Sequence, residues 1–473
     1  MNKSPLLPAL ALLLAGCATD PPQVLTPPYR AKAFVGPIDA SSEIWPKPEW
    51  WKIFGSDEMA GLVAQAQSDN LDIAAAASRV LQADAQVTIQ RSALFPQLSA
   101  QAQAERAGNS GGSLSNGGSP ISGTGNVFGL SVGATYQLDF WGLARDNLRS
   151  ANEALKSARY AQQVVALTVT ANTASRYMTV LALRQRIAIA KENIAAINDI
   201  LNVIKLRVSA GAASDLDLRQ EEAQVEAVEA QLPTLEEQET EARFTLALLL
   251  GRPPEEFAVT TQNLDGLAAP VVAPGLPSEL LLRRPDVAQA EANLAAAHAD
   301  VDAARAAFLP QIGLSADGGF ASAAIGTLLH GSNFGWDIGA NLLQTIFDGG
   351  KLAGQKDLAK ATETLLVANY RQAVLAAYSD VETALQQVAN GNKTKDHLVR
   401  EVKAARDAFT IAKLQYEHGA TDLLTVLQAQ QTLFSAQDQL VQATQARLQA
   451  SVHLYEALGG GWSEDPKGRT QKF

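Results

Sequence analysis

The sequence predicts a mainly α-helical protein with a small transmembrane β-barrel to which each chain contributes four strands. Three observations predict this class. The 473-residue chain repeats itself once along its length, four short segments alternate between apolar and polar residues, and the helical segments are far longer than a globular domain requires. We therefore expect two structural repeats whose long coiled-coil helices form an α-helical tube next to the barrel.

The N-terminus has the features of a secretory signal. A positive start at Lys3 precedes an apolar stretch of about a dozen residues, too short to span a membrane. The tetrad Leu14-Ala15-Gly16-Cys17 resembles a bacterial lipobox, which implies cleavage before Cys17 and a covalent lipid such as palmitate on its thiol. By the same resemblance, Ala18 implies the outer membrane. We assign 1–16 to a signal peptide and 17–56 to a lipidated N-terminal segment; an ordinary signal with an unrelated cysteine is the alternative.

The composition narrows the classes of partner. The formal net charge is −11, and removing Lys3 with the signal leaves −12. No basic patch stands out, so nucleic acid is not an expected partner. The acidic balance fits a solvated surface, and it also fits a pore that tolerates cations. Beyond the signal no run of about 18 apolar residues occurs, so a bilayer crossing has to use strands closed into a barrel.

Four landmarks recur in the same order at nearly constant spacing, which indicates two copies of one unit. Each copy is predicted to run helix, strand, strand, helix, turn, helix. The matched positions are Pro96 with Pro310, 214 residues on; Asp139 to Gly142 with Asp348 to Lys351, 209 on; Gly211 with Gly419, 208 on; and Gly251 with Gly459, 208 on.

Two β-hairpins are predicted, over 97–141 and 311–348, because their residues alternate with period two. Segments of about 9–11 residues suffice to cross a membrane as strands. The Gly/Ser-rich stretch 108–126 is predicted to be an exposed flexible loop, with 321–333 as its shorter counterpart. The apolar faces of the second and fourth strands carry Phe128, Leu130, Val132, Ala134, Tyr136, Leu138 and Phe140, and Phe334, Trp336, Ile338, Ala340 and Leu342.

The remaining residues divide into helices and connections. The predicted helical segments are 57–96 and 142–250 in the first copy and 285–310 and 349–458 in the second, with 251–284 as an equatorial connection and 459–473 as a C-terminal tail. The absence of proline between Gly142 and Val208 predicts a helix roughly 100 Å long. Pro233 is predicted to kink the return helix of the first copy.

Apolar residues in these helices recur at spacings of three and four, as in a coiled-coil seam. One seam runs from Val180 to Val208 and another from Leu398 to Tyr416. The turns at Gly211 and Gly419 are expected at the end of the helices far from the strands.

The number of strands predicts self-assembly. Four strands cannot close a barrel, and an open sheet edge cannot lie in lipid. Two chains would give eight strands around a filled interior, whereas three would give twelve around an aqueous lumen lined by small polar residues. We therefore predict a homotrimer, with a four-fold ring as the alternative that the residues leave open.

Several stretches occur in an order typical of one protein family. They are Trp50 to Phe54, Asn70 to Ile73, Ala77 to Val80, Phe95-Pro96, Arg283 to Val287, Phe308 to Pro310, Phe347 to Gly350 and Tyr416 to Gln430. In this order they resemble the outer membrane factor family, the TolC-like and OprM-like efflux ducts, and specifically its lipoprotein (NodT-type) branch. The likeness covers essentially the whole mature chain.

The resemblance implies a passive outer membrane exit channel of a tripartite efflux system. It implies a trimeric duct for drugs or other small molecules that crosses the outer membrane and the periplasm. It also implies docking to a periplasmic adaptor (membrane fusion) protein and an inner-membrane pump, which supplies the energy. The alternatives are a lipid-anchored coiled-coil scaffold without a pore and the outer membrane component of a type I secretion system. The cargo and the pump type stay open.

The resemblance further implies a closed periplasmic tip that opens like an iris. The tip-lining positions of the family fall on Tyr416, Leu424, Thr425 and Gln428. The family often has aspartates at the last two, so this chain lacks that acidic ring. Asp215, Asp217 and Asp422 are candidates to replace it, and capping of helix N-termini is the alternative.

Other chemistry finds little support in the residues. The five histidines are scattered without metal-ligand spacing, and no phosphate loop or nucleophile elbow occurs. We therefore expect no enzyme, no metal and no cofactor apart from the lipid on Cys17. Arg284 and Asp286 are predicted to fix a helix start with Pro285 in its first turn. Trp45, Trp50 and Trp51 are either an aromatic interface anchor or packing against the helical tube.

Overall fold

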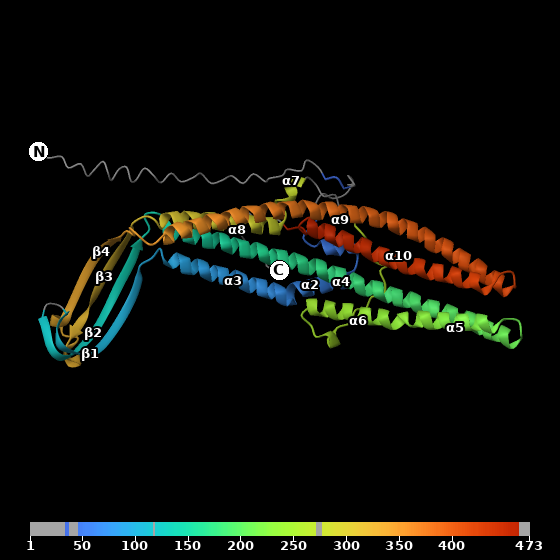
Figure 1. Cartoon of the computed structure of the whole chain (residues 1–473), viewed down its shortest axis with the longest axis horizontal. Coiled ribbons are helices and arrows are strands. Elements are labelled where there is room, and N and C mark those ends of the chain that lie inside the picture. The colour runs from blue at the N-terminus through green and yellow to red at the C-terminus, as the bar shows by residue number, and fades with distance from the viewer. Residues whose placement is uncertain (1–33, 37–45, 117–118, 271–276, 463–473) are drawn as a thin grey trace.

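The computed structural model describes residues 34–36, 46–116, 119–270 and 277–462. The predicted signal, Cys17 and Trp45 lie outside these residues. A four-stranded sheet occupies one end of an elongated body, and two helical turns occupy the other (Figure 1). None of the helices in the described ranges is both long enough and apolar enough to cross a membrane.

The sheet is antiparallel in the order β1-β2-β3-β4, so the two predicted hairpins lie side by side. Its strands are β1 (Gln97–Asn116), β2 (Ser119–Leu138), β3 (Gln311–Ser322) and β4 (Phe334–Leu343). The prediction of a flexible loop over 108–126 is wrong in extent. Gly108 pairs with Thr124 and Asn116 with Ser119, past a register shift after Asn109. Strands pair through backbone N–H and C=O groups. Glycine and serine supply both groups, so a stretch can pair as strands even where its side chains do not alternate between apolar and polar.

The helices form two tiers. The tier next to the sheet contains α3 (Leu71–Ser92), α8 (Pro285–Ala306) and the first halves of α4 (Leu143–Ser209) and α9 (Lys351–Glu417). The far tier contains α5 (Asp215–Glu229), α6 (Gln231–Leu249), α10 (Leu423–Ala457) and the second halves of α4 and α9. Shorter elements are η1 (Trp50–Phe54), α2 (Asp57–Asp69), η2 (Pro254–Glu256), α7 (Pro277–Leu280), η3 (Ile325–Thr327) and η4 (Gly331–Asn333).

The two repeats have the same order of elements and helices of matching length, which confirms the predicted duplication, although the strands of the first repeat are longer. Helices α4 and α9 each have 67 residues and start 208 residues apart, and α3 and α8 each have 22. Gly142 and Gly350 precede α4 and α9 with φ of 90° and 93°, a conformation that glycine adopts without strain. The prediction that Gly142 corresponds to Lys351 is off by one, because the turn from Asp139 is one residue longer than the turn from Asp348.

Neighbouring helices form a single curved layer. Next to the sheet the order is α3, α4, α8, α9, and in the far tier it is α5 and α6, then α4, α10 and α9. The predicted seams face their neighbours, since Val180, Ile197 and Ile204 on α4 and Ala405 on α9 are buried. The layer therefore has two free edges. One edge is α9 along its whole length, and the other is α3 followed by α6 and α5.

The predicted kink at Pro233 is an interruption of one residue, Ala230, whose backbone stays in the right-handed helical region. α5 ends at Glu229 and α6 begins at Gln231. Proline has no N–H to donate to the carbonyl four residues earlier, which is that of Glu229. The return path of the first repeat is therefore two helices, whereas the return path of the second, α10, is one.

Candidate functional site

The sheet has one apolar face and one polar face. Cross-strand partners point to the same side of a sheet, and the register aligns the apolar residues of all four strands. Leu130 of β2 lies opposite Ala102 of β1 and Phe320 of β3. This face includes Leu98, Ala100, Val132, Ala134, Tyr136, Ile312, Leu314, Phe334, Trp336, Ile338 and Leu342. Trp336 is 71% exposed and Ile338 is 76% exposed, so none of the described residues covers this face.

The opposite face of the sheet is small and polar. It carries Ser99, Gln101, Ser131, Gly133, Thr135, Ser315, Asp317, Gly319, Asp337, Gly339 and Asn341. Gly133 packs directly against the Asp317 carboxylate, where a larger side chain would collide. Glycines, hydroxyls and amides on this side fit contact with water and are ill suited to contact with hydrocarbon.

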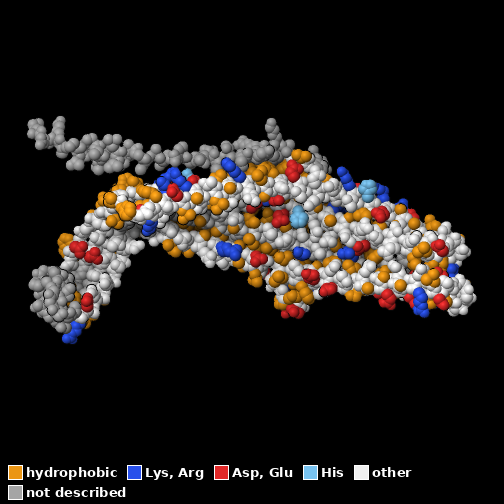
Figure 2. Space-filling model, viewed as in Figure 1, with side chains coloured by type: hydrophobic (Ala, Val, Ile, Leu, Met, Phe, Trp, Pro, Cys, Tyr) orange, Lys and Arg blue, Asp and Glu red, His pale blue; other side chains and the backbone are white. Residues whose placement is uncertain are grey.

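Aromatic side chains collect where the sheet joins the helices, and sequence reasoning missed their role. Figure 2 shows hydrophobic side chains gathered at this junction, while charges are spread along the helical body. Phe95, Phe140, Trp141, Phe308 and Phe347 are all at least 37% exposed there. The Trp141 indole donates to the Pro310 carbonyl at 2.7 Å, which ties the two hairpins together. The signal was available in the aromatic residues at both ends of each hairpin, since Phe95 and Phe308 precede the first strand of each pair and Phe140, Trp141 and Phe347 follow the second, and aromatic rings are enriched at membrane interfaces.

The far end of the body consists of two tight helical turns. Gly211 and Gly419 follow α4 and α9 with φ of 72° and 73°. In both turns the next amide closes the helix end, from Ala212 to the Arg207 carbonyl and from Ala420 to the Gln415 carbonyl, each at 2.8 Å. This left-handed glycine closure satisfies carbonyls that the helix end would leave unpaired. Both turns therefore end in the same rigid way.

The four predicted gate residues divide into two groups. Leu424, Thr425 and Gln428 are exposed on the first turns of α10. Tyr416, by contrast, is 9% exposed and packs with Ile204 of α4 and Val426 of α10. The structure thus brings three of the residues to one surface and places Tyr416 between the helices behind it.

Arg207 is the contact at the tip that sequence reasoning did not find. Its guanidinium lies 4.5 Å from the centre of the Tyr416 ring and donates to the carbonyls of Tyr416 and Glu417, both at 3.1 Å. A cation at a helix C-terminus also interacts favourably with the helix dipole. Arg207 is on α4 and its partners are on α9, so no pattern within one helix could reveal the pair. The contact joins the two repeats next to their turns.

Two of the three predicted acidic residues at the tip have structural partners. Asp422 caps α10 by accepting from the Thr425 amide at 2.9 Å and the Thr425 hydroxyl at 2.6 Å, and these hydrogen bonds lower its pKa. Asp217 accepts from the Ser214 amide at 3.1 Å in a capping box. Asp215 lies exposed in the first turn of α5. Capping accounts for Asp217 and Asp422.

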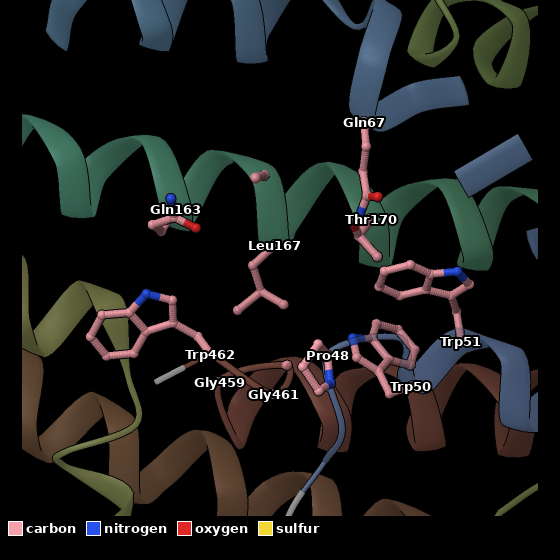
Figure 3. A pocket seen from close by; sticks show the side chains of 12 residues that line it. Pro48, Trp50, Trp51, Gln67, Gln163, Leu167, Thr170, Gly459, Gly461 and Trp462 are labelled. Carbon is pink, nitrogen blue, oxygen red and sulfur yellow. Dashed lines mark hydrogen bonds between the residues drawn. The ribbon is translucent and has the colours of Figure 1, made fainter. Parts of the chain in front are cut away.

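At mid-length, residues 48–51 and 459–462 pack against α4 (Figure 3). Trp50 is fully buried and stacks on Tyr455 with ring centres 5.0 Å apart, and Trp51 is buried beside it. Both tryptophans therefore serve packing. Gly460 has φ of 57°, a conformation that favours glycine, and packs against Leu167. The cavity between these groups holds only about 50 Å³, room for about one water molecule.

Glu58 fastens the equatorial connection to the helices. Its carboxylate accepts from the amide and hydroxyl of Thr260, at 2.6 and 2.8 Å, from the Thr261 amide at 3.1 Å and from the Tyr177 hydroxyl at 3.0 Å. Burial by itself would raise the pKa of Glu58. The hydrogen bonds from Thr260 and Thr261 outweigh burial and lower the pKa to about 2.

We expect this carboxylate to make stability depend on acidity. The folded pKa is below the ordinary value of 4.5, so the stabilisation is present above about pH 4.5 and is lost as the pH falls towards 2. Glu58→Gln should cost about 2 kcal/mol at pH 7 and flatten this pH dependence. Urea unfolding at pH 7 and pH 3 measures both. The control is Glu255→Gln, which removes an exposed carboxyl in the same connection. If its stability depended on pH as weakly as that of Glu58→Gln, the pH dependence could not be assigned to Glu58.

Arg284 joins three helices at the same level. Its guanidinium contacts Asp286 at 2.7 and 2.9 Å, Asp380 of α9 at 2.9 Å and the Ala457 carbonyl of α10 at 3.1 Å. The predicted helix start is confirmed, because Arg284 is the N-cap of α8 and Pro285 is its first residue. The contacts with Asp380 and Ala457 are beyond what the local motif predicts.

Metal chemistry finds no site in the part of the chain that the structure describes. No group of three or more histidine, cysteine, aspartate or glutamate side chains there is placed to hold an ion. His298 lies 2.9 Å from Glu363, linking α8 to α9. The distinctive surfaces of the molecule are therefore the two-faced sheet and the helical tip.

Comparisons with known proteins cover nearly the whole chain. The model of the family described as outer membrane efflux protein matches residues 62–252 and 276–460. The pyoverdine export outer membrane protein OpmQ of Pseudomonas aeruginosa is 38% identical over 98% of this chain and 97% of its own length. The outer-membrane channel OprN superposes with a TM-score of 0.85 at 28% identity, over 93% of this chain and 99% of that chain. The open MtrE channel of Neisseria gonorrhoeae gives a TM-score of 0.82 at 27% identity, over 92% and 96%.

Proposed function

This chain belongs to the outer membrane efflux protein family, and from that premise we propose that three copies close into one passive duct for small molecules. The protein resides in the outer membrane and extends into the periplasm, as its relatives do. The observation that carries the proposal is the two-faced sheet, whose exposed apolar side fits lipid and whose polar side fits water. The duct itself catalyses no reaction, and the transported small molecules pass through it unchanged.

Closure of the sheet requires other copies. β1 and β4 are the edges of the sheet, and unpaired edge groups are not tolerated in hydrocarbon. If β4 of one copy pairs with β1 of the next, three copies give twelve strands around a lumen lined by the polar face. The aromatic residues at the junction with the helices then form a collar at the periplasmic membrane surface.

The helical layer closes by the same head-to-tail step. Near the sheet both free edges are apolar, with Leu71, Leu81 and Ile89 exposed on α3 and Leu358, Leu365 and Leu375 on α9. In the far tier the α6 edge carries Glu237 and Glu241, and the α9 edge carries Lys393 and Arg400. Opposite charges on the two edges favour the joining of one edge to the other over the joining of like edges.

The charged residues also match in height along the tube. Ion pairs of Arg184 with Glu239 at 2.8 Å and of Lys191 with Glu236 at 3.1 Å place this part of α6 beside residues 184–191 of α4. The repeat offset of 208 puts residues 392–399 of α9 at the same height. Lys393 and Arg400 of one copy therefore face Glu237 and Glu241 of the next.

This pairing predicts the outcome of charge reversal. Glu237→Lys with Glu241→Lys should weaken assembly, because each interface then places like charges together. Adding Lys393→Glu and Arg400→Glu should restore a trimer that does not mix with wild-type copies. Gel mobility without heating and co-purification of differently tagged chains measure both. Assembly of the first variant at the wild-type level would contradict the edge pairing.

The N-terminal segment supports a lipid anchor at the outer membrane. We propose that Cys17 carries the lipid, while residues 34–36 contact the helical body at the level of the equatorial connection. There the Val35 and Gly36 amides donate to the two Glu382 oxygens at 2.7 and 2.8 Å, and Phe34 is buried. The tube then extends through the periplasm towards an adaptor protein and an inner-membrane pump, the partners that an efflux system needs.

The helical tip is proposed as the gate of the duct. Leu424, Thr425 and Gln428 are exposed on α10 and are assigned to the lumen surface, with Asp215, Asp217 and Asp422 near the mouth. Tyr416 is assigned to a supporting role behind them, because it is buried against α4. Planar-bilayer conductance tests the duct directly. A purified trimer that does not conduct, even after Leu424→Ser loosens the tip, would overturn the proposal.

A further inference from the structure

One carboxyl group lies inside the coiled coil of the first repeat. Glu221 occupies a seam position of α5, between Leu218 on one side and Val225 and Val228 on the other, at spacings of three, four and three. Its side chain is 0% exposed. Such positions are normally apolar because they pack into the neighbouring helix.

Both carboxyl oxygens of Glu221 lack a hydrogen-bond partner among the described residues. The adjacent seam residues pack in aliphatic clusters, Leu218 against a cluster with Ile204 and Val426, and Val225 against one with Ile197. An ionised carboxylate without a partner in such surroundings costs several kcal/mol. The protonated form is therefore the one that this packing accommodates.

The charged groups on the surrounding helices do not offset this cost. On α4, Lys205 is exposed, and Arg207 is bound to the end of α9. On α5 itself, Arg219 and Glu222 pair with each other at 2.7 Å on the surface. On α10, the stretch 423–430 contains no charged residue. Burial alone raises the pKa of Glu221, to about 7.

We propose that Glu221 is a proton-sensitive latch that keeps α5 packed against α4 in the hairpin at the tip when protonated and loosens this packing when ionised. Among the helices, α5 packs mainly on α4 and only lightly on α10, to which Gln224 bonds through Gln431 at 3.1 Å. Ionisation draws water to the seam close to the turn at Gly211. This inference rests on the proposed function in one respect, namely that the tip of the tube is the gate.

The direction of the effect follows from proton linkage. In the closed hairpin the pKa of Glu221 is about 7, whereas the ordinary pKa of a glutamate is 4.5. The closed form therefore binds more protons than the open form between these values, and it loses stability as the pH rises through them. The equilibrium for opening should increase on the order of a hundredfold from pH 4.5 to above 7.

The test uses the full-length trimer in lipid nanodiscs. Infrared difference spectra between pH 5 and 8 should show a protonated-carboxyl band that titrates near 7 and is absent in Glu221→Gln. Hydrogen exchange in 215–229, corrected for intrinsic rates, should accelerate with pH in the wild type and stay flat in Glu221→Gln. Glu222→Gln, the adjacent surface carboxyl, should behave as the wild type.

Identical pH profiles for the wild type and Glu221→Gln would overturn the latch and leave the duct untouched. Conductance provides the link to the gate: leak should rise with pH in the wild type and not in Glu221→Gln. A titrating band with pH-independent conductance in an active channel would overturn the latch as a gate device. If no variant conducts at any pH, the proposed function fails instead, while the spectra still report on Glu221.

Discussion

Arg207→Ala is expected to raise the leak of the trimer in planar bilayers by roughly tenfold or more. The guanidinium contacts two carbonyls at the end of α9 and the face of the Tyr416 ring. Hydrogen bonds from a charged donor together with a cation–π contact stabilise by about 2 kcal/mol after allowance for partial exposure. That energy corresponds to roughly thirtyfold in the closed-to-open ratio of one copy. The loss should appear as a higher open probability without a change in single-channel conductance.

Arg219→Ala is the matched control for this prediction. Arg219 is also an arginine near the tip, but it is 74% exposed and pairs only with Glu222 on its own helix. Its removal should leave the leak unchanged, because surface pairs of this kind contribute little. The leak of Arg207→Lys should lie between those of the wild type and Arg207→Ala, since lysine keeps the charge but lacks the planar guanidinium group. Equal leak in Arg207→Ala and Arg219→Ala would show that the α4–α9 contact does not hold the tip.

Arg284→Ala is expected to cause the largest loss of stability. The substitution leaves the carboxylates of Asp286 and Asp380 and the carbonyl of Ala457 without their shared donor. Removing one partner of a buried ion pair costs about 3–5 kcal/mol. Because Asp380 is half exposed, we expect about 3 kcal/mol. The midpoint of urea unfolding, followed by circular dichroism in detergent, measures the change.

Lys52→Ala serves as the control for Arg284→Ala. Lys52 pairs with Glu49 at 2.8 Å with both side chains more than half exposed, so its loss should cost no more than about 0.5 kcal/mol. Arg284→Lys should recover part of the stability, because one charge can still reach a carboxylate. If Arg284→Ala unfolds at the same urea concentration as Lys52→Ala, the three-helix junction is not a major source of stability.

Periodicity predicted the architecture well because it reflects burial. The seam from Val180 to Val208 records which side of α4 packs against other helices, and the alternation in β2 records which side of the sheet is apolar. The long helices and the two-faced sheet could therefore be inferred before their contacts were known. The prediction was poor where it rested on amino-acid composition and not on a periodic pattern. The Gly/Ser-rich stretch 108–126 reads as a loop, but its backbone pairs as strands.

The tip shows why site residues were harder to predict. Tyr416 carries a ring suited to a gate, but whether it faces the lumen or α4 depends on the packing of three helices. Arg207 and Tyr416 are 209 residues apart, and their contact becomes visible only when the two repeats are placed side by side. Glu221 was hidden for the opposite reason, since a glutamate in the acidic helix α5 looks like a surface residue until Val225 and Val228, on the same side of the helix, are seen to be buried.

The equal length of α4 and α9 limits how such a molecule can change in size. Both helices have 67 residues, so their turns end level and the rim of the tube is flat. Insertion of seven residues into the long helix of one repeat alone would raise the rim by about 10 Å on one side of each subunit. Matched insertions in the long helices and the return helices of both repeats would instead lengthen the tube evenly. Evolution towards a wider or narrower gap between two membranes therefore requires coordinated change in both halves of the gene.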